Sequence, residues 1–192
     1  DVLHYKKSGY LPHALVNYCV RLGWAHGDDE IFTQEQLVEY FTLKAVGKKS
    51  AVFDIQKLQW LNCVYMKELS PEICLNWLVA DVEPDLLEKL SGWSKETALK
   101  LIGLYQERVK TGAELVAVLI ELHHGPSEYN ADDLHKWVGR EPRGQLDKLV
   151  PELKALPEFT GEAIKQVIKT FCKEQDIKLV MVAQPLRIAM TG

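Results

Sequence analysis

The chain ends with the segment Gln184-Pro185-Leu186-Arg187-Ile188-Ala189-Met190-Thr191-Gly192, which is the most informative stretch of the sequence. Proline is favoured at the first position of a helix, because its φ already suits a helix and its missing N–H is not needed there. We therefore predict a helix that begins at Pro185. The spacing of Leu186, Ala189 and Met190 places them on one face, and Arg187 leaves on a different side. Because this helix would begin so close to the last residue, we expect that the chain is cut from a longer one.

Composition limits the kind of partner that the chain can have. Its 192 residues suffice for one large domain or two small ones, and an apolar fraction of 47% allows a packed core. The net charge is −4, so a sheer excess of positive charge does not drive binding to nucleic acid, although a local basic face stays open. We find no apolar run of about 18 residues and therefore expect no membrane span, and the N-terminus has no signal-peptide pattern.

Hydrophobic periodicity predicts helices along nearly the whole chain. One clear stripe at helical spacing consists of Ile164, Val167, Ile168, Phe171 and Cys172. The predicted helix starts carry N-capping residues, which are Thr33 (with Gln36 in a capping box), Asp54, Ser70 (before Pro71), Ser94 and Thr160. Lys48-Lys49-Ser50 is a polar break, and residues 179–182 fit either a short strand or a loop. The predicted fold class is all-α, with helical bundles in two to three consecutive groups.

The sequence offers no recognisable catalytic or metal site. The cysteines, Cys19, Cys63, Cys74 and Cys172, have no CxxC spacing, and their apolar helical contexts favour buried free thiols in a reducing compartment. His123 and His124 are adjacent and would diverge on a helix, which argues against a shared metal ion. No HExxH, GxSxG, Walker A or GxGxxG motif occurs. The residues alone indicate a noncatalytic helical binding module.

Four segments, in order along the chain, resemble bacterial glutamyl-tRNA synthetase. They are GYLPHALVNY with LGW (9–18 and 22–24), IFT (31–33), VFDIQKLQWLN (52–62) and QPLRIAMTG (184–192). In that family this region follows the lysine-rich ATP-binding signature of the class I catalytic domain, and nothing similar to that signature occurs here. The resemblance therefore implies a C-terminal fragment, and a start at Asp1 rather than Met favours either a fragment or a processed product.

The resemblance also implies a function and a division into regions. The parent enzyme would be a cytoplasmic, commonly monomeric glutamate–tRNA ligase that joins glutamate to tRNA(Glu) with ATP and Mg²⁺. The fragment would be inactive alone, would hold no cofactor and would recognise the inner corner and anticodon of the tRNA. It would comprise a stem-contact region (1–68), a first anticodon-binding subdomain (69–125) and a second, C-terminally truncated one (126–192). The glutaminyl relative reads its anticodon with β-barrels, so an all-α chain favours the glutamyl branch.

Two arginines are candidate RNA contacts through this resemblance. Arg108 occupies the position that reads the last anticodon base in enzymes strict for glutamate tRNA, and its planar fork of donors suits a base edge. The alternative is a solvated arginine paired with Glu107 or another acid. Arg187 matches the arginine of the terminal motif, and we expect it in the first turn of a helix, where free N–H groups suit phosphate. The alternative is an ordinary surface cation.

Three further candidates are Lys57, Trp60 and Lys110. Lys57 and Trp60 lie three residues apart on a helix that, by resemblance, faces the inner corner of the tRNA, although Trp60 could instead belong to the core. Lys110 is a candidate phosphate contact, as are Lys6, Lys7 and Lys100. Trp24, Trp77 and Trp93 are predicted to be packing residues. Trp137 has the basic neighbours Lys136, Arg140 and Arg143. This composition fits either an RNA contact or an ordinary helix end with long basic side chains.

Two other functions compete with RNA binding. A helical protein–protein interaction module would show the same periodicity with no RNA role, and a helical enzyme with an unrecognised site is the third reading. In the family, the chain continues beyond Gly192 with a helix and loop that help to read the first two anticodon bases. We therefore expect an exposed apolar face in the last helical group.

Overall fold

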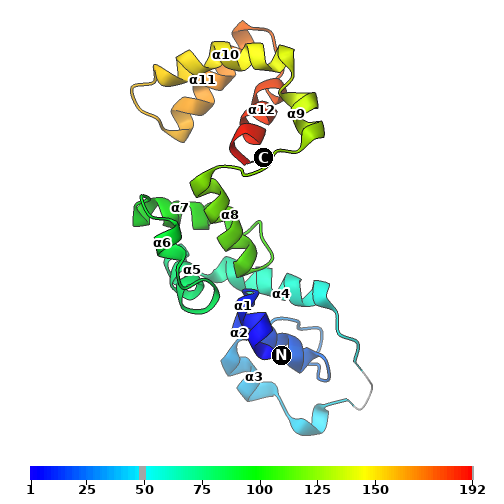
Figure 1. Cartoon of the computed structure of the whole chain (residues 1–192). Coiled ribbons are helices and arrows are strands. Elements are labelled where there is room, and N and C mark those ends of the chain that lie inside the picture. The colour runs from blue at the N-terminus through cyan, green and yellow to red at the C-terminus, as the bar shows by residue number, and fades with distance from the viewer. Residues whose placement is uncertain (48–50, 192) are drawn as a thin grey trace. The chain divides into compact units, whose positions relative to one another are not determined.

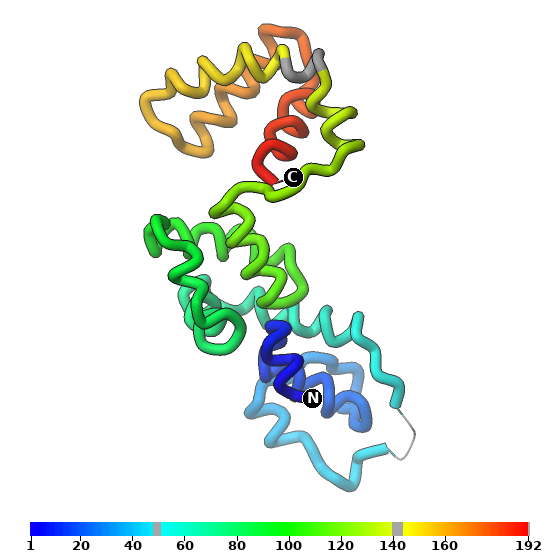
Figure 2. The backbone as a smooth tube through the Cα atoms, in the orientation of Figure 1, coloured from blue at the N-terminus to red at the C-terminus, as the bar shows by residue number. Residues whose placement is uncertain are grey.

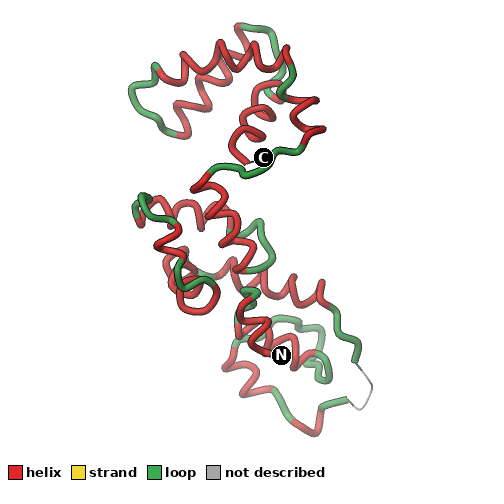
Figure 3. Tube along the Cα trace, viewed as in Figure 1, coloured by secondary structure: helices red, strands yellow, loops and turns green. Residues whose placement is uncertain are grey.

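The computed structural model describes residues 1–47 and 51–191, except for the side chains of residues 140–143. Across this part of the chain the regular elements are helices and helical turns, and none is a strand (Figures 1 and 3). The predicted all-α class is therefore confirmed. The predicted break at Lys48-Lys49-Ser50 lies outside the described residues.

The chain forms two compact units, Asp1–Ile120 and Glu121–Gly192. The first contains α1 (Val2–Lys7), α2 (Pro12–Arg21), α3 (Gln34–Tyr40), the 3₁₀ turn η1 (Leu43–Ala45), α4 (Ile55–Glu68), α5 (Pro71–Trp77), the π turn η2 (Leu78–Val82), α6 (Leu86–Lys89), α7 (Lys95–Tyr105) and most of α8 (Gly112–His124). The second contains the end of α8 and α9 (Ala131–Trp137), α10 (Arg140–Lys154), α11 (Gly161–Glu174) and α12 (Val180–Thr191).

The predicted N-caps are confirmed. Thr33 Oγ1 accepts from the Gln36 N–H at 3.2 Å, and Gln36 Oε1 accepts from the Thr33 N–H at 2.8 Å, which completes the capping box. The other predicted caps, Asp54, Ser70, Ser94 and Thr160, each accept from a backbone N–H in the first turn of the helix that follows. Local side-chain chemistry therefore decides where these helices begin.

The predicted start of the last helix is wrong. α12 begins at Val180, and Pro185 lies inside it with no N–H to donate. An interior proline costs about 3 kcal/mol, and here its ring is buried along with Val182 and Ile188, which offsets that cost. Residues 179–182 were too short an apolar run for periodicity to separate strand, loop and helix.

The face that carries Leu186, Ala189 and Met190 is not the buried face of this helix. The buried residues are Val182, Pro185 and Ile188, and Leu186 packs at the edge of the same cluster. Ala189 is exposed, and 63% of Met190 is accessible. Because the helix begins earlier, its inner face is set by Val182, and Met190 falls outside it. Met190 thus contributes exposed apolar surface to the second unit, as we expected of the last helical group.

The core of the first unit has one large cluster and two smaller ones. The large cluster joins the helices from α5 to α8 around side chains such as Leu78, Ile102 and Leu115. A second cluster packs α2 against α4 through Tyr18, Leu58 and Leu61, and a third surrounds Trp24. Burial of each such large side chain stabilises the fold by about 1.5–3 kcal/mol. The packing role predicted for Trp24, Trp77 and Trp93 is confirmed, since Trp24 is buried and the other two pack against the large cluster.

The second unit is built on the stripe predicted for residues 164–172. Phe171 and Cys172 are buried on α11, and Val167 and Ile168 pack beside them. Leu149 from α10 and Val182 from α12 complete this core. The helical period of the sequence therefore identified the inner face of α11 correctly.

All four cysteines are free. Cys74 and Cys172 are buried as expected, but the expectation is wrong for Cys19, which is exposed, and for Cys63, which is only partly buried. Helix α2 buries Ala14, Asn17 and Tyr18, and this face leaves Cys19 exposed. A polar residue, Asn17, thus occupies an inner position that an apolar pattern does not reveal.

Candidate nucleic-acid interface

The segment from Arg108 to Thr111 connects α7 to α8 and presents two cations. Val109 and Thr111 are buried, at 8% and 7% exposure, while Arg108 and Lys110 are exposed. The alternation puts the two basic side chains on the outer side of the connection. We call residues 108–111 the basic loop.

Arg108 is not neutralised within the described part of the chain. Its guanidinium carbon lies 5.6 Å from the ring centroid of Tyr105, and no carboxylate there forms an ion pair with it. The described residues therefore show a solvated arginine, as in the alternative, but without the expected pairing to Glu107 or another acid. The guanidinium keeps its donors available while the tyrosine ring supports it from one side.

The backbone of the basic loop is tied down at several points. Cys63 Sγ lies 3.4 Å from the Val109 carbonyl oxygen, and Asn62 Nδ2 donates to the Lys110 carbonyl at 2.8 Å. The Lys110 N–H donates to Glu114 Oε2 at 2.6 Å. Just before the loop, Gln106 is buried and Nε2 donates to the Leu69 carbonyl at 3.0 Å. The exposed cations therefore stand on a fixed main chain.

Lys57 and Trp60 share a face of α4, as predicted. Lys57 Nζ lies 6.0 Å from the Trp60 ring centroid, and 43% of Trp60 is exposed. The alternative that Trp60 belongs to the core is therefore wrong. Asp54 caps this helix by accepting from the N–H groups of Gln56 and Lys57 at 2.8 and 3.2 Å, which fixes its first turn.

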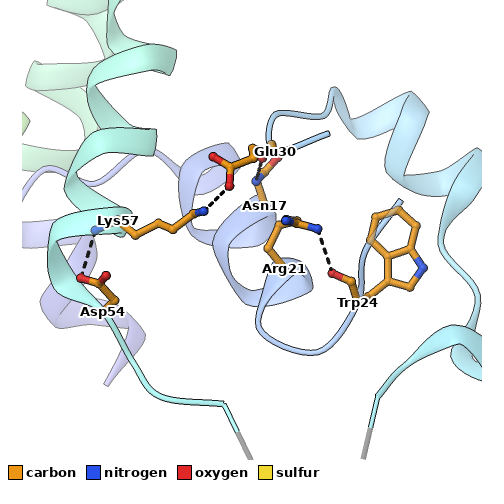
Figure 4. A network of polar contacts seen from close by, with 6 residues as sticks. All are labelled: Asn17, Arg21, Trp24, Glu30, Asp54 and Lys57. Atoms are coloured by element: carbon orange, nitrogen blue, oxygen red, sulfur yellow. Dashed lines mark hydrogen bonds and ion pairs between the residues drawn. The ribbon is translucent and has the colours of Figure 1, made fainter. Parts of the chain in front are cut away.

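The ammonium of Lys57 is held by Glu30, which the sequence did not reveal (Figure 4). Asn17 Nδ2 donates to the Glu30 carbonyl at 2.8 Å and holds this segment in place. The hydrogen bond from Lys57 keeps the pKa of the Glu30 carboxyl below its usual value. Both side chains remain partly exposed, so the ion pair is open to competition from a phosphate.

The turn of α4 that follows Trp60 contacts the basic loop. Cys63 lies one turn after Trp60 and reaches Val109. Burial raises the pKa of the Cys63 thiol. The charge of Glu114 raises this pKa further, and the charges of Lys67 and Lys110 lower it. The structure thus brings Cys63, which lies three residues after Trp60 on α4, to the basic loop.

Arg187 lies in the second unit and is engaged by its own neighbours. Its Nε donates to Gln184 Oε1 at 2.9 Å, and Nη2 lies 3.7 Å from Asp133 Oδ2. Because α12 begins at Val180, Arg187 is not in a first turn, and the prediction that it is accompanied by free N–H groups is wrong. The side chain is 51% exposed, so its outer donors face solvent.

The remaining basic candidates differ in how far they are neutralised. Lys6 pairs with Asp81 at 2.9 Å, and Lys100 pairs with Glu96 at 2.8 Å. Trp137 is half-buried, with Lys136 Nζ 5.0 Å from its ring centroid. The side chains of its other predicted basic neighbours, Arg140 and Arg143, lie outside the described residues.

Two features that sequence reasoning missed are Asn62 and Glu30. Asn62 lies four residues after Leu58, within the buried side of α4, and a polar residue within such a stripe is a recognisable signal of a buried hydrogen-bonding group. Glu30 lies in a loop 27 positions before Lys57, and no local pattern connects the two.

Other features of the molecule lie away from these side chains. A cavity of about 520 Å³ between Val79, Leu90 and Trp93 is lined mainly by apolar groups. Among the side chains that the structure describes, no group of three or more His, Cys, Asp or Glu is arranged to hold a metal ion. None of the helices described is long and apolar enough to cross a membrane.

Comparison with known proteins identifies the family. Residues 74–192 match the model of the anticodon binding domain, and residues 1–60 match the catalytic domain of class I tRNA synthetases (E and Q). A glutamate tRNA ligase from Elizabethkingia meningosepticum is 28% identical with a TM-score of 0.84 over 97% of this chain, and a glutamate-tRNA synthetase from Elizabethkingia anophelis is 28% identical with a TM-score of 0.77 over 95%. The chain spans 36% and 35% of those two proteins. The chain belongs to the anticodon-binding domain family, whose model covers most of its length, and its first 60 residues match the class I (E and Q) tRNA synthetases.

Proposed function

We propose that this chain is the tRNA-binding part of a glutamate–tRNA ligase and that the basic loop reads the anticodon. The observation that carries the proposal is that the basic side chains of this loop are exposed while its backbone is held by hydrogen bonds. Arg108 and Lys110 are exposed and have no carboxylate partner on their side chains within the described residues, while the loop backbone is held by α4 and Glu114. The loop also lies inside the segment that matches the anticodon-binding family.

The chemistry of arginine favours one anticodon over another. By the genetic code, the third anticodon base is C in glutamate tRNA and G in glutamine tRNA. The Watson–Crick edge of cytosine offers acceptors at O2 and N3, whereas that of guanine presents N1–H and N2–H donors in the same place. Arg108 has only donors, so it fits C and is repelled by G. The proposed partner is therefore tRNA(Glu).

The other predicted residues have supporting roles in this proposal. Trp60 offers an aromatic face to a ribose or base, and Lys57 and Lys110 offer ammonium groups to phosphates. Arg187 would approach the RNA from the second unit with the donors that Gln184 and Asp133 leave free. The three regions 1–68, 69–125 and 126–192 remain our division of these tasks.

The chemical step is assigned to the rest of the parent enzyme. ATP and Mg²⁺ would supply the activated glutamate there, and we assign no residue of this chain to that step. We propose that the chain alone is inactive, and that the parent is cytoplasmic and monomeric.

Salt dependence of tRNA binding tests the proposal. We expect a bacterial tRNA(Glu) transcript to bind this chain in a filter assay, with affinity falling steeply between about 50 and 200 mM salt. Each lost phosphate contact reduces the slope of log K against log salt by about 0.7–0.9. We expect Lys110→Gln to reduce it by one such step. Lys95→Gln is the matched control, because Lys95 is already paired with Glu72 at 2.5 Å.

Two results would contradict the proposal. A chain that binds no tRNA, or binds it with an affinity that salt does not change, would favour the helical protein–protein module. An equal effect of Lys110→Gln and Lys95→Gln would mean that the basic loop does not meet the RNA.

A further inference from the structure

Asn62 is a fully buried polar residue on the inner side of α4. Its exposure is 0%, and it lies four residues from both Leu58 and Met66, each also at 0%. An amide side chain in such a place must have hydrogen-bond partners, because a buried donor or acceptor without one is strongly destabilising. Its partners come from two segments far away in the sequence.

The amide of Asn62 joins three segments. Oδ1 accepts from the Leu11 N–H at 2.8 Å. Nδ2 donates to the Lys110 carbonyl at 2.8 Å and to the Gly9 carbonyl at 3.3 Å. An amide has two N–H donors, and the geometry provides an acceptor for each. One side chain thus links α4 with the turn before α2 and with the basic loop.

The turn between α1 and α2, drawn in blue, lies against the start of α8, drawn in green (Figure 2). The Gly112 N–H donates to the Gly9 carbonyl at 2.8 Å. A Cβ on Gly9 would lie 2.4 Å from the Ala113 nitrogen, so only glycine allows this approach. The segment after the basic loop is therefore fixed by the same turn that Asn62 holds.

The hydrogen bonds of Asn62 also join the segments that match two different family models. Gly9 and Leu11 lie in the segment that matches the catalytic domain, whereas Lys110 lies in the anticodon-binding match. Asn62 falls between the two matches, and all three segments belong to one compact unit. The basic loop is thus bonded to the part of the chain that resembles the catalytic domain.

We propose that Asn62 is a positioning residue that sets where the basic loop presents Arg108 to the third anticodon base. The inference rests on the proposed function of the loop. A recognition group must be held within about 0.5 Å of its productive place by the groups behind it. Asn62 supports the loop through its hydrogen bond to the Lys110 carbonyl, and Glu114 supports it through its hydrogen bond from the Lys110 N–H.

The test compares two RNAs. The probes are a bacterial tRNA(Glu) transcript and the same transcript with G in place of C at the third anticodon position, and the readout is the ratio of their dissociation constants. We expect Asn62→Ala to reduce this ratio by about fivefold or more, the lower limit of one bidentate base contact. Circular dichroism shows whether the variant is folded under the binding conditions.

Asn17 provides a matched control. It is also 0% exposed and bonds to the Glu30 carbonyl and the Phe32 N–H, both at 2.8 Å, but it does not contact the basic loop. Asn17→Ala should lower stability and leave the ratio unchanged. An equal loss of discrimination in both variants would mean a general structural effect and would overturn the inference.

A double substitution shows whether Asn62 acts through Arg108. In an Arg108→Gln background, Asn62→Ala should change the ratio no further, because the group that it positions is gone. If Arg108→Gln itself leaves the ratio unchanged, the proposed function of the loop fails. If Arg108→Gln removes discrimination and folded Asn62→Ala keeps it, only the role of Asn62 fails.

Glu114 keeps the test decisive if Asn62→Ala does not fold. Glu114 is exposed, so its replacement leaves the core intact. Glu114→Gln retains an acceptor for the Lys110 N–H, whereas Glu114→Ala removes it, and both remove the charge. A lower ratio for Ala than for Gln supports positioning of the loop by its tethers, and equal ratios would overturn it.

Discussion

The ammonium of Lys57 donates a hydrogen bond to the Glu30 carboxylate, so a cation that we propose to meet RNA is already neutralised within the chain (Figure 4). A phosphate that binds Lys57 has to compete with Glu30 for the charge of the ammonium. Because both partners are partly exposed, water screens the ion pair and the competition is not prohibitive. Glu30 thereby moderates the affinity of this part of α4 for RNA.

Glu30→Gln should strengthen tRNA binding. The substitution releases the Lys57 ammonium and removes a negative charge beside the proposed path of the RNA. We expect a steeper salt dependence, by about 0.7–0.9 in the log–log slope if one phosphate contact is gained. Glu72→Gln is the matched control, since it releases Lys95 on another part of the first unit. The same gain for both variants would show a general charge effect and would exclude Lys57 as a specific contact.

Trp60→Ala should weaken tRNA binding with little loss of stability. Stacking of a base on an aromatic ring contributes about 1–3 kcal/mol, and 43% of Trp60 is already exposed. Trp24→Ala, at 4% exposure, should instead cost about 3–5 kcal/mol of unfolding free energy. Filter binding and urea denaturation measure the two effects. Strong destabilisation by Trp60→Ala with unchanged binding would place Trp60 in the core.

The caps and the α11 stripe were predictable because their chemistry is local. Thr33 finds Gln36 three residues away, and Phe171 follows Val167 by one helical turn. The early start of α12 was not predictable in this way. Pro185 is tolerated inside that helix only because the tertiary structure buries it, and burial of this kind is not a property of a short segment.

The candidate site was predictable only in part. The resemblance directed attention to Arg108 and Trp60, and the structure leaves both exposed. The acid that holds Lys57 and the amide that holds Lys110 come from 27 and 48 positions away. Such pairings depend on how the helices pack, so single-sequence patterns do not contain them.

Gly9→Ala should be markedly more destabilising than Gly125→Ala. Both glycines have a positive φ, +76° and +80°, so each substitution brings about 1–2 kcal/mol of backbone strain. Only Gly9 has backbone atoms within 2.5 Å of the new Cβ, whereas Gly125 faces open space. The resulting overpacking adds about 1–3 kcal/mol for Gly9 alone. Urea denaturation measures the difference, and equal losses would contradict the close approach of Gly9 to α8.

Thiol labelling should separate Cys19 from Cys74. Cys19 is exposed, whereas burial raises the pKa of the Cys74 thiol to about 12. At about pH 8 roughly one Cys74 in ten thousand would be the reactive thiolate, and a rise in pH toward 12 increases that fraction. We expect iodoacetamide to label Cys19 in the native chain and Cys74 only after unfolding, as measured by peptide mass spectrometry. Equal labelling rates in the native chain would contradict the burial of Cys74.

The central claim is tested most directly by measuring four dissociation constants. Wild type and Arg108→Gln are each titrated with the two transcripts that differ at the third anticodon base. We expect wild type to favour C over G by about 5- to 150-fold, the equivalent of 1–3 kcal/mol for one bidentate contact. Arg108→Gln should bind both transcripts with nearly equal affinity. If the variant keeps the preference of wild type, or if wild type shows none, the basic loop does not read the anticodon.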